Sequence, residues 1–211
     1  MSGKRMPELT RRALLAAAYD EIYRRGFQAA SLESILKEAD LTKGALYHHF
    51  PSKLELGYAV VDEIIRPMMR AQWVDKMAGD TDTIQILQII ASDLSVLVGW
   101  ECLHLGSPLA NLAHEMSPLD EGFRSRISGL YSELHLILTY AIERGQRNGF
   151  VRKSIDPLRV AAFIIASVEG ALCLMKNTMD KNLLVDCGQE LLRYLDNLRE
   201  PQTEPVRQTA P

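Results

Sequence analysis

Residues 31–53 constrain the fold of this chain more than any other stretch, because they predict two short helices joined by a tight turn. Ser31 can cap a first helix from Leu32 to about Ala39, whose apolar residues recur at helical spacing. The turn at residues 40–41 is too short to hold another element. A second helix follows from Lys43 to about Phe50. The pattern therefore predicts a helix-turn-helix in an all-α head.

The second of these helices divides into an inward and an outward face. Leu46 and Phe50 lie four residues apart and can both face a core, which leaves small and polar side chains outside. Such an exposed helix start suits the major groove of DNA, where short side chains allow close approach. The residues predicted to contact DNA are Ser31, Thr42, Lys43, Gly44, Ala45, Tyr47, His48, His49 and Lys53.

The chemistry of this outward face assigns its members different roles. Lys43, in the first turn, can reach guanine O6 and N7, and Ala45 can offer its methyl group to thymine. Tyr47, His48 and His49 can donate hydrogen bonds to phosphates, which set register but carry little sequence information. A solvated polar surface is the alternative interpretation of the same residues.

The run from about Arg11 to Leu56 resembles the DNA-binding domain of the TetR family of bacterial transcriptional regulators. The resemblance rests on the Gly26-Phe27 pair and, most specifically, on LTKGALYHHFPSK. It implies that the positions from Lys43 to His49, together with Lys53, make the operator contacts. Asp40 departs from the pattern, since many members have glycine there. Aspartate tolerates the left-handed conformation better than most residues, so we expect only a modest loss of stability.

The remainder of the chain has the size and composition of one larger helical body. The 211 residues are 47% hydrophobic and no stretch reads as a strand, so we expect an all-α protein of about nine helices. Residues 1–53 hold nine Lys/Arg and six Asp/Glu, whereas the rest hold fifteen and twenty-one. This split suits a head that meets phosphate. The expected parts are a helix-turn-helix DNA-binding domain (1–55), an effector-binding and dimerisation domain (56–200) and a disordered tail (201–211).

Capping residues and helix breakers predict where the other helices begin and end. The first nine residues are expected to be disordered, and Pro67 should bend the helix that contains it. The expected helices run from about Thr10 to Arg25, from Lys53 to Met77, near 83–98, from the Ser117-Pro118 cap to about Asn148, from the Asp156-Pro157 cap to about Asn177, and from Leu184 to Arg199.

Cysteine usage and hydropathy indicate a cytoplasmic protein without a membrane partner. Cys102, Cys173 and Cys187 are widely spaced, and no CxxC pair occurs, so neither a disulfide framework nor a structural metal is expected. The N-terminal residues lack the apolar run of a signal peptide. The longest apolar stretch, Val160–Met175, is interrupted by Glu169 and is too short to span a bilayer comfortably. No cofactor is expected.

The stretch from Pro157 to Asn177 is apolar nearly all round, so its helix must be covered on more than one side. A central core helix and a helix shared with a subunit interface both fit this pattern. The interface is favoured because the TetR resemblance implies dimerisation through the last two long helices, and because a twofold dimer doubles the contacts on a palindrome. The predicted interface residues are Ala161, Ile164, Val168, Gly170, Ala171, Leu191 and Tyr194.

Residues 100–116 mix polar and aromatic side chains in the least regular part of the chain. A zinc site is not favoured because Cys102, His104 and His114 lack a recognised ligand spacing. A redox switch at Cys102 is a second alternative, although an isolated cysteine is usually a small buried hydrophobe. A pocket for a small-molecule effector is the remaining interpretation. Its predicted lining is Trp100, His104, Asn111, His114, Met116, Tyr131, His135, Glu169 and Cys173.

These features predict a ligand-responsive transcriptional regulator, most simply a repressor. It would bind a palindromic double-stranded DNA operator as a homodimer and be released by a small-molecule effector that favours one conformation. An architectural DNA-binding protein with the same head and no small ligand is the alternative. The chain contains no GxSxG, HExxH, P-loop or GxGxxG motif, so we do not expect an enzyme.

Overall fold

The computed structural model of the chain describes residues 5–77, 82–92, 94 and 100–201. Helices account for most of these residues, and their only β-pairing is an isolated antiparallel bridge between Val151 and Arg199. The predicted all-α class is therefore confirmed. The predicted tail falls almost wholly outside the described part of the chain, as does the linker at 78–81.

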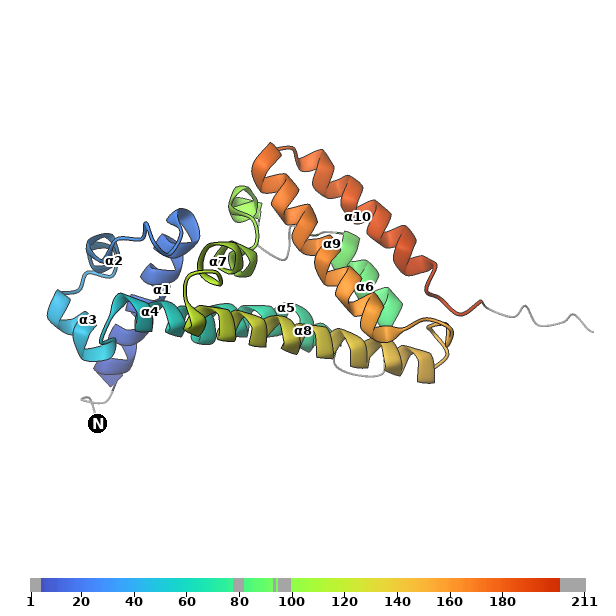
Figure 1. Cartoon of the computed structure of the whole chain (residues 1–211), viewed down its shortest axis with the longest axis horizontal. Helices are drawn as coiled ribbons and strands as arrows, with labels where there is room; N and C mark the ends of the chain where they lie inside the picture. The colour runs from blue at the N-terminus through green and yellow to red at the C-terminus, as the bar shows by residue number, and fades with distance from the viewer. Residues whose placement is uncertain (1–4, 78–81, 93, 95–99, 202–211) are drawn as a thin grey trace, which may run out of the picture.

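The N-terminal head consists of three helices at one end of the molecule (Figure 1). They are α1 (Arg5–Arg25), α2 (Leu32–Glu38) and α3 (Lys43–His49). Leu14, Ala18 and Ile22 form the inner face of α1, as their spacing predicts. The expectation of disorder before Thr10 is wrong for residues 5–9. An ion pair between Glu8 and Arg12, with Nη2 and Oε1 2.7 Å apart, spans one extra helical turn there.

A continuous helical rod joins the head to the body and runs to Met77, as predicted. It comprises α4 (Lys53–Val60), a π-helical turn η1 (Val61–Ile65) and α5 (Arg66–Met77). The π turn lies directly before Pro67. Proline has no backbone N–H to give to the carbonyl of Glu63, so the hydrogen-bond pattern is free to widen at this point. The irregularity therefore precedes the proline rather than following it.

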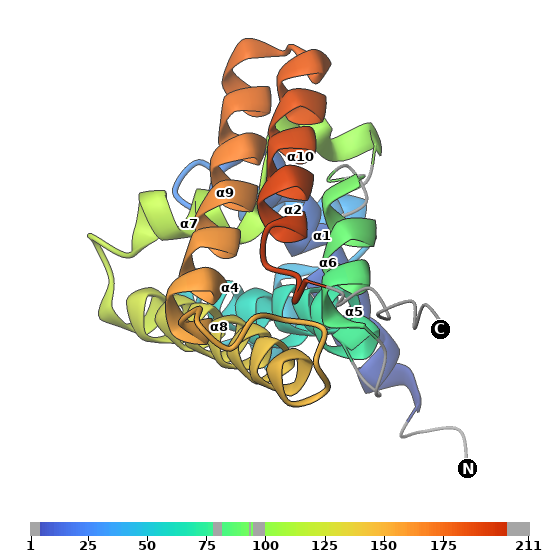
Figure 2. The same cartoon turned by 90° about the vertical axis from the view of Figure 1, so that its right-hand side faces the viewer.

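The body packs five further helices around this rod. They are α6 (Thr83–Ser92), α7 (Pro108–Met116), α8 (Glu121–Arg147), α9 (Pro157–Thr178) and α10 (Lys181–Asp196), with a 3-10 segment η3 at Trp100–Leu105. Helix α8 lies along α5, whereas α9 and α10 run side by side and α6 packs against α10 (Figures 1 and 2). Counting the rod as one helix gives nine in the described residues, as predicted. Buried side chains from head and body form one contiguous core.

Two predicted helix starts are corrected. Helix α8 begins after Asp120 rather than at Ser117-Pro118, because Asp120 Oδ1 accepts hydrogen bonds from the Phe123 amide at 2.8 Å and from the Tyr58 hydroxyl at 2.7 Å. Ser117 instead ends α7, and its amide donates to the Ala113 carbonyl. Helix α10 begins three residues earlier than predicted because Asp180 caps it, and it ends at Asp196. The predicted stretch 93–98 lies outside the described residues, apart from Leu94.

Other local signals match the structure. Asp40 has a φ of 53°, the left-handed conformation expected there, and Gly149, with a φ of 78°, follows the end of α8. Asp156 caps α9 through hydrogen bonds from the amides of Leu158 and Arg159.

Helix α9 has 22 residues, and its most apolar window has a mean hydropathy of 1.9. By length and composition alone it could cross a membrane, contrary to the expectation from Val160–Met175. Here it packs against α8 and α10.

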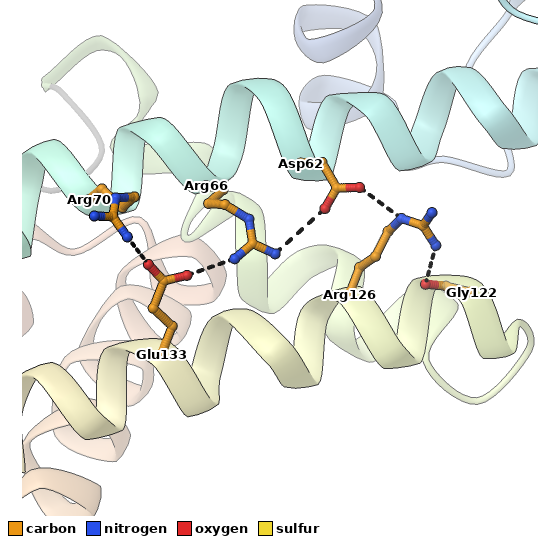
Figure 3. Close-up of polar contacts among 6 residues, drawn as sticks. All are labelled: Asp62, Arg66, Arg70, Gly122, Arg126 and Glu133. Carbon is orange, nitrogen blue, oxygen red and sulfur yellow. Dashed lines mark hydrogen bonds and ion pairs between the residues drawn. The ribbon is translucent and has the colours of Figure 1, made fainter.

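A line of ion pairs fixes the rod against α8 (Figure 3). Glu133 accepts from Arg66 at 2.6 Å and also pairs with Arg70. Arg66 lies 3.6 Å from Asp62, whose other oxygen accepts from Arg126 Nε at 2.9 Å. These side chains are partly exposed, so each single pair contributes little to stability. Joined in one network across the π turn, they set the register of the two helices.

Candidate DNA interface and effector pocket

Helix α3 presents the face that its sequence predicts. Thr42 Oγ1 caps the helix by accepting from the Ala45 amide at 3.3 Å. Leu46 and Phe50 are buried at 0% and 3% exposure, which fixes the rotation of the helix on the head. Tyr47 on the opposite side is 52% exposed. Around it lie the exposed Thr42, Lys43, Gly44 and His48 and the half-buried Ala45 and His49.

No contact inside the chain explains why residue 44 is glycine. A Cβ built on it would meet only the Thr42 hydroxyl, at 3.8 Å, and its φ is not positive. Glycine inside a helix costs about 0.5–1 kcal/mol relative to alanine. A residue that weakens α3 without helping any internal contact is explained by close approach of something outside the chain.

Three of the other predicted contact residues also interact within the head. Ser31 Oγ accepts from the Ser34 amide at 3.4 Å and caps α2. Lys53 Nζ donates to the Gln28 carbonyl at 3.0 Å and lies 5.0 Å from the ring centroid of Phe27, so in this state its charge is directed at the head itself. Partial burial, with His48 and Arg11 close by, lowers the pKa of His49. The His49 ring is therefore neutral at pH 7.

The junction between head and body was missed by the sequence analysis. The carboxylate of Glu115, on α7, accepts hydrogen bonds from the backbone amides of Phe27 and Gln28, each at 2.8 Å. Phe123, on α8, is fully buried with its ring centroid 4.7 Å from that of Phe27. A Cβ on Gly57 would lie 2.5 Å from Phe27, so α4 approaches these rings closely only because residue 57 is glycine. A glycine inside a predicted helix was therefore the sequence signal for this close contact between head and body.

Three cavities in the body meet at Glu169. The largest, about 720 Å³, is a groove between α8 and α9 that ends at α7 and includes His114, Tyr131 and His135. A second, about 160 Å³, includes Asn111 and Cys173. The third, about 60 Å³, lies toward α5 and is mainly apolar. Six of the nine predicted effector residues therefore line the three cavities that share Glu169.

The other three predicted effector residues lie elsewhere. Met116 is 5% exposed and belongs to the core, where its spacing on α7 places it beside Leu112. His104 is exposed and lines none of these cavities within the described residues, because the 3-10 segment turns it outward. The side chain of Trp100 lies outside the described part. The apolar lining was missed, since such side chains carry no sequence signal apart from core membership. It comprises Met68, Met69, Trp73, Leu109, Leu134, Ile165 and Leu172.

The predicted interface residues divide into two groups. Five are at most 5% exposed within a single chain and can offer little surface to a partner: Ala161, Ile164, Val168, Ala171 and Leu191. They lie in the core of the single chain, where α8, α9 and α10 pack together, although Ala171 and Leu191 also border the surface groove between α9 and α10. Gly170 and Tyr194 remain accessible. They line a groove of about 310 Å³ between α9 and α10, together with Phe163 and Leu174.

Comparison with known proteins agrees with this architecture. Residues 14–60, which include all of α2 and α3, match the bacterial regulatory proteins of the tetR family, and residues 101–187 match the tetracyclin repressor-like C-terminal domain. A further match is an uncharacterized HTH-type transcriptional regulator in the lacX 3' region of Lactococcus lactis subsp. lactis. It is 30% identical over 175 residues, which are 83% of this chain and 87% of the relative.

The chain belongs to the TetR family of bacterial transcriptional regulators. Another relative is the HTH-type transcriptional repressor DhaR of Mycobacterium sp. (strain GP1), which is 28% identical over 153 residues, 72% of this chain and 75% of DhaR. A crystal structure of a TetR transcriptional regulator from Chloroflexus aurantiacus J-10-FL shares the fold, with a TM-score of 0.84 and 24% identity over 93% of this chain and all of that one. The family consists of DNA-binding transcription regulators, not enzymes.

Proposed function

We propose that this TetR-family protein is a cytoplasmic repressor that binds a palindromic operator as a homodimer and is released by a small-molecule effector. The observation that carries the DNA-binding half is the outward face of α3, with Gly44 serving no internal contact. The other residues that we propose contact DNA are the ones predicted from the sequence: Ser31, Thr42, Lys43, Ala45, Tyr47, His48, His49 and Lys53. The name of DhaR, a repressor, supports repression over activation.

The effector half of the proposal is supported by the cavities around Glu169. An architectural DNA-binding protein has no need of cavities in the body around a half-buried carboxyl group, so the alternative function is not favoured. The groove is lined by α7, α8 and α9. Two of these helices reach the DNA-binding part directly: α7 through Glu115, and α8 through Phe123 and the ion-pair network on the rod.

These contacts provide a physical route for release. An effector that fits the groove better in one arrangement of α7 and α8 shifts the population toward that arrangement. Because Glu115 holds the loop after α1, a displacement of α7 moves the head with it. In a dimer this would change the separation of the two α3 helices. That separation must match the distance between the two operator half-sites, which is about 34–36 Å for each helical turn of DNA between them.

The direct test is selection of a duplex by the full-length protein at low salt, followed by binding measurements on the selected sequence. We expect a palindromic site, a stoichiometry of two chains per duplex, and affinity that falls steeply with salt as phosphates are neutralised. A chain that sediments as a monomer and binds no duplex at low salt would contradict the proposal. A DNA-binding dimer that no small molecule releases would favour the architectural alternative.

Two substitutions on α3 should separate base reading from phosphate contact. Lys43→Ala should relax sequence preference at one base position, at a cost of about 1–3 kcal/mol if its contact is bidentate. Tyr47→Phe removes only a hydroxyl from an exposed ring, so it should weaken binding to all sequences alike. The measurement is a panel of operators with single base changes. Equal, sequence-independent losses for both variants would show that Lys43 does not read bases.

A further inference from the structure

Glu169 is a half-buried acid whose two carboxylate oxygens differ in their hydrogen bonds. Its Oε1 accepts a hydrogen bond from the Tyr131 hydroxyl at 3.2 Å. Its Oε2 is buried and makes no direct hydrogen bond among the described residues, although the Ser107 hydroxyl lies near enough to the carboxyl group to favour its charged form. An unpaired buried oxygen costs about 1–3 kcal/mol, and more when it is charged. Because Glu169 lines three cavities, a ligand in one of them can supply the missing donor once the side chain turns Oε2 toward it.

The surroundings of Glu169 favour a donor that is also a cation. Among the described residues that line the three cavities, Glu169 carries the only carboxylate, and the two permanent cations there are engaged, Arg124 with Glu121 and Lys176 with the Asn111 side chain. The Tyr131 ring lines the groove, and Trp73 lines the small apolar cavity on the other side. Aromatic rings attract cations through their faces, and the effect is strongest where water is excluded. A neutral apolar ligand would leave Oε2 unsatisfied.

We propose that the effector is an amine, whose ammonium group donates to Glu169 Oε2 while its apolar part lies in the groove between α8 and α9. The inference rests on the proposed function, since it names the chemical class of ligand for the same effector site. The large groove accommodates the apolar part, and its walls include Ile127, Ala162, Ile165 and Ala166. Glu169 would therefore act as the counter-ion that selects the ligand.

Titration should reveal this pairing. Burial raises the pKa of Glu169, an effect opposed by the hydroxyls of Ser107 and Tyr131 and by His114. An ammonium ligand needs the carboxylate charged, so its affinity should rise as pH increases through this raised pKa. The other titratable or charged groups lining these cavities are His114 on α7, Arg124, Tyr131 and His135 on α8, and Cys173 and Lys176 on α9. The pH dependence of ligand affinity that these other groups cause is what remains in a Glu169→Gln variant.

The experiment uses three probes with one carbon skeleton: 4-phenylbutylamine, 4-phenylbutan-1-ol and 4-phenylbutanoate. Calorimetry on the full chain measures each affinity for the unmodified protein, Glu169→Gln and Glu143→Gln. Glu143 is the matched control, because it pairs with Arg147 on the surface of α8 and lines none of the three cavities. We expect the amine to bind about tenfold or more tightly than the alcohol, with the carboxylate weakest. Glu169→Gln should abolish that preference, and Glu143→Gln should keep it.

The contrary outcomes are equally clear. If the alcohol or the carboxylate binds as tightly as the amine, if no amine binds at millimolar concentration, or if Glu169→Gln keeps the preference, the assignment of an amine is wrong. Circular dichroism of Glu169→Gln separates loss of ligand from loss of fold. These results leave operator binding untouched, so failure of the amine assignment differs from failure of the repressor proposal, which would appear as absent duplex binding.

Discussion

Gly170→Leu is expected to convert the proposed dimer into a monomer and to reduce operator affinity by orders of magnitude. Within one chain a Cβ at this position meets nothing within 4 Å, so a single subunit accommodates the new side chain. Phe163, Ala166, Ser167, Gly170 and Leu174 recur at helical spacing and form one stripe on α9. The small residues between the two large ones allow a partner helix to come close, and leucine would prevent that approach.

Gly129→Leu is the matched control for this prediction. Gly129 lies on the exposed side of α8, and a Cβ there also meets nothing within 4 Å. Both changes remove a helical glycine and should add up to about 1 kcal/mol of helix stability per chain. Sedimentation should therefore show a dimer for Gly129→Leu and a monomer for Gly170→Leu. A stable Gly170→Leu dimer would place the interface on another surface.

The starts of α2, α3, α4 and α9 could be predicted because their signals are local. Ser31, Thr42, Ser52 and Asp156 each accept a hydrogen bond from an amide two or three residues ahead, so the cap and its target lie in the same few letters of sequence. Ser117-Pro118 has the same local appearance. Asp120 is used instead because it also binds Tyr58, a residue 62 positions away, and a local pattern contains no information on that partner.

The faces of α9 could not be assigned from sequence for a different reason. A helix that is apolar nearly all round has no polar stripe to mark the outside, so Ala161 and Gly170 looked equivalent as interface residues. Only the packing of α8 and α10 distinguishes them, burying Ala161 completely and leaving Gly170 open. The effector site shows the same limit. Its polar members were predicted by residue type, whereas Met68 and Trp73 became recognisable only once α5 was placed.

Phe123→Ala should be the most destabilising single change at the junction of head and body. Phe123 is fully buried, and its ring makes edge contacts with Phe27 and Tyr58 at centroid distances of 4.7 and 5.1 Å. Truncating a buried phenylalanine removes its transfer free energy and leaves a cavity, at a cost of about 3–5 kcal/mol. Urea unfolding at fixed protein concentration measures the loss, since the stability of a dimer depends on concentration.

Phe123→Leu and Leu136→Ala are the control variants with which the loss of stability in Phe123→Ala is compared. Leucine at 123 keeps most of the apolar volume and should cost less than alanine, whereas Leu136 on the same helix is 48% exposed and should change stability little. Head and body share one contiguous core, so Phe123→Ala should lower the stability of both. The variant should still unfold in a single transition, without earlier unfolding of the head. Two separate transitions in the variant, reported by the fluorescence of the two tryptophans in the body, Trp73 and Trp100, and by far-ultraviolet circular dichroism, would show that Phe123 joins two independently stable units. Operator affinity would then fall at urea concentrations that leave the body intact.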